Sequence, residues 1–285
     1  MLRIILIFIF ILTCFTEASG EVYTQSPPAP ASRQTLVFGF LPILSAERLV
    51  KRFAPLVDYL SRHTNLDIRM ETAPDFAAFI QRTQRSRRYD ILFTAPHFFY
   101  LAEQQRGYRG LVRVNRSDME AIIVVPANSD INTLPDLRGR SLATTGPLAL
   151  STLLIRDLLL QSGLDPDEDL RLVPTPSHIA ALLSSYQGNT DASAIMQPVF
   201  RRVRPQIKNN MRIIATSAPV PHIPLGVAPW VDEATARRLQ QTLLGMQDNP
   251  AGRRVLEHLD WPGFVPLQGQ EYANLRRLAE QVKLD

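Results

Sequence analysis

The chain has 285 residues, a formal net charge of +4 and a single cysteine, Cys14. This length suits one two-lobed protein or a single large domain. The small positive charge comes without a basic stripe interleaved with aromatic residues, so we expect no nucleic-acid partner. A lone cysteine leaves no disulfide, and we expect neither a metal site nor a cofactor. Packing must therefore provide the stability.

The N-terminus has the pattern of a secretory signal peptide. Met1-Leu2-Arg3 is a basic start, residues 4–12 are apolar, and Ala18-Ser19-Gly20 offers small residues for cleavage. The apolar run is too short for a spanning helix, although an uncleaved anchor is the alternative. Thr13 precedes Cys14 where a lipoprotein would need a small residue, which argues against lipid anchoring. The sequence predicts a cleaved signal peptide over residues 1–20 and a periplasmic protein.

Residues 21–35 are polar and proline-rich, which predicts an extended linker. Beyond them, short apolar strands alternate with amphipathic helices. Strands are expected at residues 36–40, 67–71, 90–93, 120–125, 141–144, 170–173, 192–195 and 212–215. Helices are expected at residues 46–61 and 232–247, from Pro74, Pro96 and Ser177, and from Ser151 to Leu160. This alternation predicts an α/β fold with mostly parallel sheets flanked by helices.

The order of these segments predicts two lobes. A second strand–helix series begins after Pro126, and the proline-rich residues 219–224 end it. We expect lobe 1 to comprise residues 36–125 plus 221–285, and lobe 2 to comprise residues 127–218. Two crossover segments, near residues 125–128 and 217–221, would join the lobes. A ligand would then bind in the interlobe cleft, which closes by a hinge motion.

Five turns follow expected strands and could border that cleft. They lie at residues 41–45, 72–75, 94–97, 145–152 and 175–178. Ligands of open α/β sheets bind beyond the carboxyl ends of the strands, where helix N-termini present N–H groups and a positive dipole end. Ser151 and Thr152 can donate hydroxyls to an oxyanion or carboxylate there, although ordinary helix capping also explains them. His178 could bond a ligand oxygen.

Other candidates are less specific. His97, Phe99 and Tyr100 follow Pro96, and neighbouring aromatic side chains cannot all face one way, so some must be core. We keep His97 and Tyr100 as candidate cleft residues, together with His222 in the second crossover. The sequence carries no hydrolase, zinc-protease or phosphate-loop signature, so we expect a binding protein rather than an enzyme.

Three segments resemble the phosphate/phosphite/phosphonate-binding family of periplasmic solute-binding proteins that serve ABC importers. They are Leu134-x-Asp136-Leu137-Arg138-Gly139, residues 177–195, and Tyr89-Asp90-Ile91 leading to Ala95-Pro96. The resemblance implies a type II periplasmic-binding-protein fold and a small anionic solute. It also implies a monomer that docks on an ABC permease at the inner membrane.

The chain departs from the phosphonate site that the resemblance implies. The family has a Ser-Thr-Ser run at a helix start, a His-Asp pair, two tyrosines and acidic groups for an amine. The corresponding residues here are Ala149-Leu150-Ser151, His178-Ile179, Phe76 and Phe99, and His222 or Ile223. Phe76 and Phe99 thereby become candidates for contact with an apolar part of the solute. The departures favour a phosphonate-like ligand, or a less polar oxyanion or carboxylate, over phosphate or an aminoalkyl phosphonate.

Two functions of different class remain open at this point. The first is a transport receptor that closes on its solute and docks on a permease. The second is a periplasmic sensing module that regulates a membrane signalling protein by the same closure.

Overall fold

The computed structural model describes residues 33–282. The predicted signal peptide and most of the predicted linker lie outside the described residues. The linker ends earlier than predicted, because Thr35 already pairs in the first strand. None of the described helices is long and apolar enough to cross a membrane.

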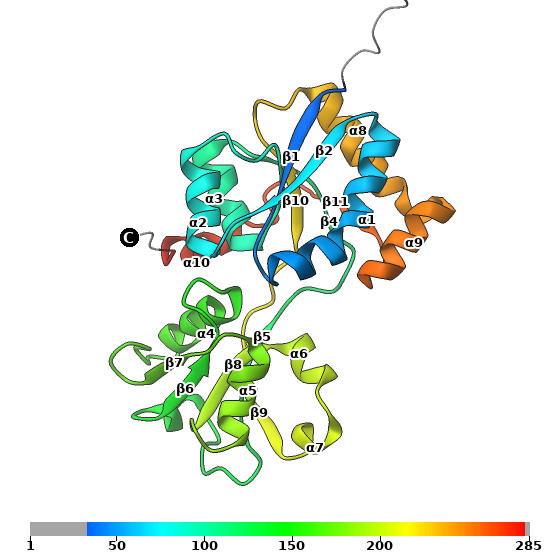
Figure 1. Cartoon of the computed structure of the whole chain (residues 1–285). Coiled ribbons are helices and arrows are strands. Elements are labelled where there is room, and N and C mark those ends of the chain that lie inside the picture. Colours follow the sequence, from blue (N-terminus) through cyan, green and yellow to red (C-terminus); the bar gives the residue numbers. More distant parts are fainter. Residues whose placement is uncertain (1–32, 283–285) are drawn as a thin grey trace, which may run out of the picture. The chain divides into compact units, whose positions relative to one another are not determined.

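Within residues 33–282, lobe 1 is built on a six-stranded sheet with the order β11-β4-β10-β3-β1-β2 (Figure 1). Its strands are β1 (Thr35–Phe40), β2 (Asp67–Thr72), β3 (Ile91–Phe93), β4 (Arg109–Val114), β10 (Pro224–Val227) and β11 (Phe264–Pro266). Its helices are α1 (Ala46–Thr64), α2 (Phe76–Arg85), α3 (Pro96–Arg106), α8 (Glu233–Leu244), α9 (Pro250–Leu259) and α10 (Arg276–Glu280). Short 3-10 turns, η2 (Gly245–Asp248) and η3 (Ala273–Leu275), complete it.

Lobe 2 has a five-stranded sheet with the order β7-β6-β8-β5-β9 in the same range. Its strands are β5 (Ala121–Pro126), β6 (Ser141–Thr144), β7 (Arg171–Pro174), β8 (Ala192–Met196) and β9 (Met211–Thr216). Its helical segments are η1 (Leu134–Leu137), α4 (Leu150–Gln161), α5 (His178–Tyr186), α6 (Gln197–Arg202) and α7 (Pro205–Lys208). The two-lobed α/β fold predicted from the sequence is confirmed.

The sheets are mixed rather than mostly parallel. β1 runs parallel to β2 and β3, and β6 runs parallel to β7 and β8, as βαβ units require. β5 and β10, however, run antiparallel to both of their neighbours. The chain enters each of these two strands from the other lobe. Neither strand therefore follows a helical crossover in its own sheet, which would require it to run parallel. β11 also runs antiparallel to β4. Each sheet is therefore a parallel βαβ part extended by antiparallel strands.

The first lobe boundary also needs correction. We predicted that residues up to 125 belong to lobe 1, but β5 pairs with β8 and β9 of the second sheet. The first crossover therefore comprises residues 115–120, and the second comprises residues 217–223. β5 is a wholly apolar run, and such a run indicates a buried strand without indicating which sheet it joins.

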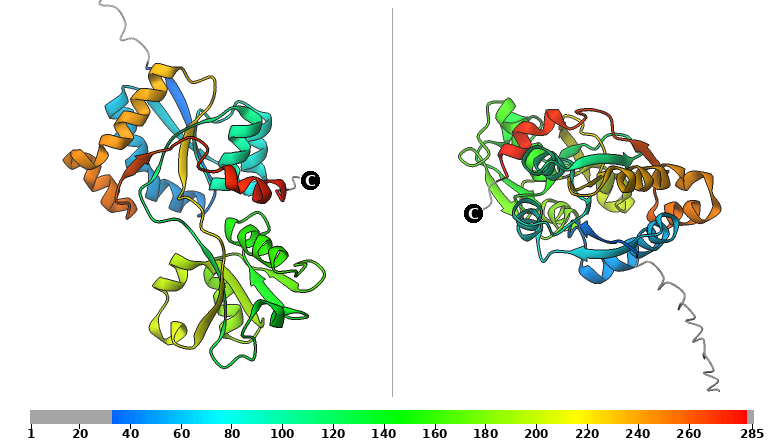
Figure 2. Two further views of the ribbon diagram at one scale, coloured as in Figure 1. Left: turned by 180° about the vertical axis from the view of Figure 1, so that it is seen from behind. Right: turned by 90° about the horizontal axis from the view of Figure 1, so that it is seen from above.

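The two crossovers are hydrogen-bonded to each other. Met119 and Val220 exchange both backbone bonds, with N···O distances of 2.7 and 2.9 Å. The view from behind shows the two segments passing together between the lobes (Figure 2). A paired two-segment connection of this kind is the geometry of a hinge.

Helical periodicity explains how lobe 1 is packed. α1 buries Leu49, Phe53, Leu56 and Leu60 on one face, as their spacing predicts, and ends at Asn65 in the left-handed conformation. Phe53 meets rings from the first and third strands, and these contacts form the aromatic centre of the lobe. This packing fixes the ends of β1 and β3, from which two of the predicted turns extend.

Candidate functional site

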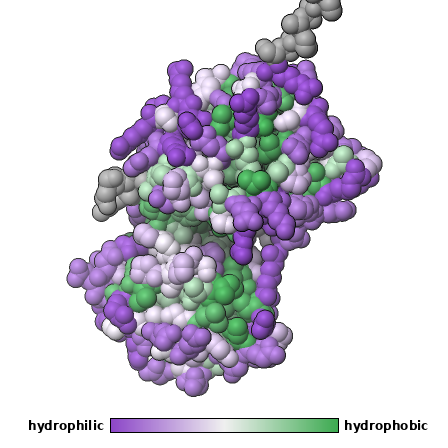
Figure 3. All heavy atoms as spheres, viewed as in Figure 1, coloured by the Kyte–Doolittle hydropathy of each residue, from purple (hydrophilic) through white to green (hydrophobic). Residues whose placement is uncertain are grey.

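A cavity of about 570 Å³ lies between the two lobes. Lobe 1 lines it with Pro42, Ile43 and residues 74–77, and lobe 2 lines it with residues 145–149 and 175–178. We call this the cleft cavity. It is formed by four of the five turns singled out from the sequence. In the space-filling view, hydrophobic and weakly polar surface borders the recess between the lobes (Figure 3).

The lobe 1 wall is largely apolar. Phe76 begins α2 and lies half-buried in the wall, with its ring edge-on to that of Phe98 at a centroid distance of 5.8 Å. Asp75 is the acidic residue of the wall, and its Oδ1 accepts a 2.7 Å bond from the Ala78 N–H as the cap of α2. Capping engages one oxygen of that carboxylate and orients it at the start of α2.

One polar end of the lobe 2 wall is Thr145, which belongs to a cluster of three hydroxyls. Thr145 lines the cavity directly after β6, and its Oγ1 lies 2.9 Å from Ser151 Oγ and 3.2 Å from Thr152 Oγ1. Thr152 also donates to the Thr145 carbonyl at 3.2 Å. Ser151 and Thr152 are buried, so they stand behind Thr145 and do not line the cavity themselves. If Ser151 donates inward to Thr145, the Thr145 hydroxyl is left to donate to a ligand.

Helix α4 begins beside this cluster without a side-chain cap. Its N-cap residue is Ala149, which offers no acceptor, and the first helical backbone bond runs from Leu153 N to Ala149 O at 3.1 Å. α5, by contrast, is capped by Ser177, whose Oγ accepts from the Ala180 N–H at 3.1 Å. The start of α4 therefore presents unpaired N–H groups and a positive dipole end, both of which favour an anion.

His178 is the first residue of α5 and lines the cleft cavity. Burial lowers the pKa of its imidazole, and no described group bonds its Nδ1. The imidazole is therefore neutral at pH 7. A bound anion would favour its protonated form.

His97 does not line the cleft cavity but stands behind its wall. The side chain is fully buried, and Nε2 lies 3.1 Å from the carbonyl oxygen of Leu148 in the other lobe. Burial lowers the pKa of this imidazole to about 4, an effect that the carbonyl opposes only in part. Because a carbonyl can only accept, Nε2 carries the proton and donates it across the lobes.

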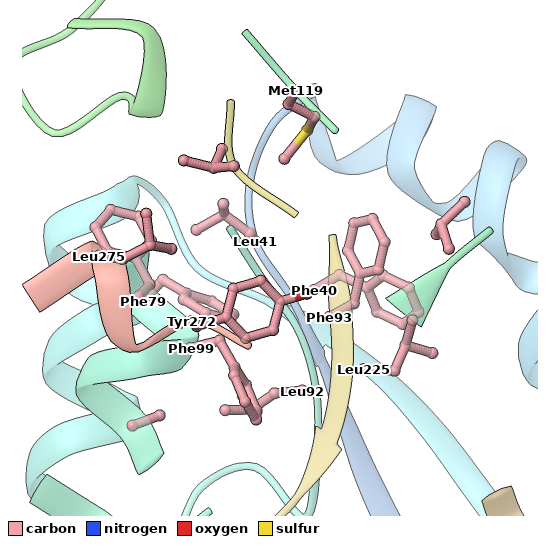
Figure 4. Close-up of a cluster of buried hydrophobic side chains, with 14 of the residues drawn as sticks. Phe40, Leu41, Phe79, Leu92, Phe93, Phe99, Met119, Leu225, Tyr272 and Leu275 are labelled. Atoms are coloured by element: carbon pink, nitrogen blue, oxygen red, sulfur yellow. The ribbon is translucent and has the colours of Figure 1, made fainter. Parts of the chain in front are cut away.

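Phe99 was wrongly predicted as a cleft residue. It is fully buried in lobe 1, and its ring lies edge-on to Tyr272 at 5.9 Å (Figure 4). β10 passes so close that a Cβ on Gly226 would lie 2.4 Å from Phe99 Cε2. Phe99 is thus a core residue that fills the space a glycine leaves open. The approach of β10, which is remote in sequence, decides this.

Tyr100 and His222 line other cavities. Tyr100 borders a surface cavity between α3 and α10. His222 borders a cavity of about 550 Å³ on the crossover side, together with Arg52, Arg116 and Arg201. Burial, with Arg116 and Arg113 nearby, lowers the pKa of His222 to about 4. Neither residue shares the cleft cavity with Phe76 and His178.

The residues that line the cleft cavity carry little charge. Its lining contains no lysine or arginine among the described residues, and its acidic residue is the capping Asp75. Within residues 33–282, no group of three histidine, cysteine, aspartate or glutamate side chains is placed to hold a metal ion. The lining residues that the sequence analysis did not single out individually include Thr145, Leu148 and Ile43. Thr145 could have been recognised as the polar residue that directly follows a buried strand.

A family model described as the periplasmic substrate-binding protein of phosphonate ABC transporters matches residues 38–272. The chain belongs to this family. Its members are solute-binding proteins of the periplasm rather than enzymes, and they deliver small molecules to a permease. The resemblance found in the sequence is thereby confirmed.

Solved structures agree on the fold of this substrate-binding protein. A Xanthomonas citri protein, solved with chloride and with ATP, has a TM-score of 0.75 at 24% identity, over 87% of this chain and 96% of that one. PhnD1 from Prochlorococcus marinus, in complex with methylphosphonate, has a TM-score of 0.74 at 15% identity, over 87% and 98%. A binding protein of a Pseudomonas aeruginosa phosphonate transporter has a TM-score of 0.72 at 18% identity, over 87% and 86%.

Proposed function

We propose that this substrate-binding protein captures a small organic anion with an apolar substituent, such as an alkyl- or arylphosphonate or a carboxylate, and presents it to an ABC permease. The cleft cavity carries the proposal because it combines a polar end in lobe 2 with a largely apolar wall in lobe 1. Thr145 and the uncapped start of α4 form the polar end. Phe76, Ile43 and Leu148 supply apolar surface.

The same lining argues against more highly charged solutes. A phosphate dianion that leaves water needs most of its oxygens paired and its charge compensated. Here it would meet the Thr145 hydroxyl, helix N–H groups and a neutral imidazole, with no lysine or arginine among the described lining residues. An aminoalkyl phosphonate would need carboxylates for its amine, and the described lining offers only Asp75, one oxygen of which is bonded to the Ala78 N–H.

Calorimetry with a graded ligand series tests the proposal. The series comprises phenylphosphonate, butylphosphonate, methylphosphonate, 2-aminoethylphosphonate and inorganic phosphate. We expect affinity to rise with the apolar substituent and to be lowest for inorganic phosphate and the amine. Tightest binding of phosphate or of 2-aminoethylphosphonate would contradict the proposal.

The sensing alternative uses the same cleft and differs in the membrane partner. Uptake of the bound phosphonate into vesicles that contain a permease and its ATPase would support transport. Binding without uptake, together with ligand-dependent control of a membrane kinase or cyclase, would support sensing.

A further inference from the structure

The polar end of the cleft cavity and a direct lobe-to-lobe contact share one short loop, residues 145–149. Thr145 starts this loop and faces the cavity, and Ala149 ends it as the N-cap of α4. Between them, the carbonyl of Leu148 lies 3.1 Å from His97 Nε2 of lobe 1. Any movement of lobe 1 relative to lobe 2 therefore acts on the loop that would hold the anion.

We propose that His97 is a positioning residue that fastens the 145–149 loop to lobe 1 and so couples the lobe separation to anion binding. This inference rests on the proposed function for its ligand and on the structure for its contact. His97 does not line the cavity and touches no ligand. It acts through the Leu148 carbonyl, which it holds against the start of α3.

The surroundings of His97 indicate that its hydrogen bond to Leu148 matters, and not only the space that its ring occupies. Its side chain is fully buried, and it is wedged against Phe98 at a ring-centroid distance of 3.9 Å. A buried donor without an acceptor is costly, so the N–H favours lobe positions in which the Leu148 carbonyl is within reach. Nδ1 has no described partner, which makes the Leu148 contact the hydrogen bond that orients the ring.

A second interlobe contact provides a matched comparison. Arg277 of α10 reaches Asp157 of α4 at 3.4 Å, and the arginine side chain is 66% exposed whereas that of the aspartate is 14% exposed. Solvent around the arginine screens this ion pair, so we expect it to contribute little. This pair joins the same two lobes and the same helix, α4, but not the 145–149 loop. A variant that breaks the Arg277–Asp157 pair therefore shows the effect of losing an interlobe contact while the bond from His97 to the 145–149 loop is kept.

The test compares His97→Phe, His97→Gln and Arg277→Gln in the full chain. His97→Phe keeps a ring of similar size without the N–H, and His97→Gln restores an amide N–H donor. Spin labels at Val50→Cys on α1 and Leu160→Cys on α4, both exposed, report the lobe separation in a Cys14→Ser background. Stopped-flow binding of phenylphosphonate reports the dissociation rate.

We expect His97→Phe to lengthen or broaden the ligand-free interlobe distance and to speed phenylphosphonate dissociation by about threefold to tenfold, as loss of one hydrogen bond implies. His97→Gln should restore both readouts, and Arg277→Gln should change each much less. An unchanged distance in His97→Phe, no rescue by His97→Gln, or an equal effect of Arg277→Gln would overturn the inference. If the native chain fails to bind phenylphosphonate, the proposed ligand class fails, and the ligand-free distances still decide the role of His97.

Discussion

Replacing Thr145 by valine tests the polar end of the cleft cavity most directly, because valine keeps the shape and removes only the hydroxyl. In the ligand-free protein, Ser151 Oγ loses the Thr145 hydroxyl at 2.9 Å, whereas Thr152 keeps its bond to the Thr145 carbonyl. An unsatisfied buried hydroxyl costs about 1–3 kcal/mol of stability. In the complex, a hydrogen bond to a charged oxygen is lost, worth about 1.5–3 kcal/mol. Binding should therefore weaken by roughly tenfold to a hundredfold.

Calorimetry with phenylphosphonate measures this loss, and urea denaturation measures the change in stability separately. Thr83→Val is the matched control, since Thr83 is a buried threonine whose hydroxyl donates to the Phe79 carbonyl within α2. It should lose stability without losing affinity. If Thr145→Val binds phenylphosphonate as tightly as the native chain while remaining folded, the anion does not bind at the start of α4.

The burial of two histidines and the close packing of one glycine lead to three further tests. Because burial lowers the pKa of His178 and a bound anion should raise it, phenylphosphonate should bind more tightly at about pH 6 than at about pH 8. Calorimetry should detect proton uptake on binding, and a pH dependence that persists unchanged in His178→Gln would exclude this residue as its source. The pKa of His97 is about 4 in the folded chain, against an ordinary value of 6.5 once the chain unfolds, so only the unfolded chain takes up this proton between those values. Stability in urea should therefore fall by roughly 1–2 kcal/mol through this group between about pH 6.5 and about pH 5, and a His97→Phe variant with the same slope would contradict this. Gly226→Ala would place a Cβ 2.4 Å from Phe99 Cε2 and 2.8 Å from the Arg109 carbonyl, so it should destabilise lobe 1 by about 1–3 kcal/mol in urea; native-like stability would show that Phe99 can move.

Local sequence patterns were sufficient to predict most of the strands and helices, but not β4, β10 or β11. The alternation of apolar strands with amphipathic helices reflects local propensity and one-sided burial. Both can be recognised from the spacing of apolar residues along the sequence. Pro96 and Ser177 mark helix starts because proline lacks an N–H and serine accepts one. Four of the five turns that were predicted between a strand end and a helix start line the cleft cavity.

Long-range packing, by contrast, settles which sheet receives β5 and which side chains reach the cavity. An apolar strand such as β5 satisfies its burial in either lobe, and its pairing with β8 and β9 depends on residues more than sixty positions away. Phe99 is a core residue because a distant glycine strand packs on it, and Ser151 lies behind Thr145 because of the rotation of α4. The bond from His97 to the Leu148 carbonyl depends on the apposition of two lobes, which no local pattern encodes. Local patterns record which side chains avoid water, and long-range pairing selects the partners that cover them.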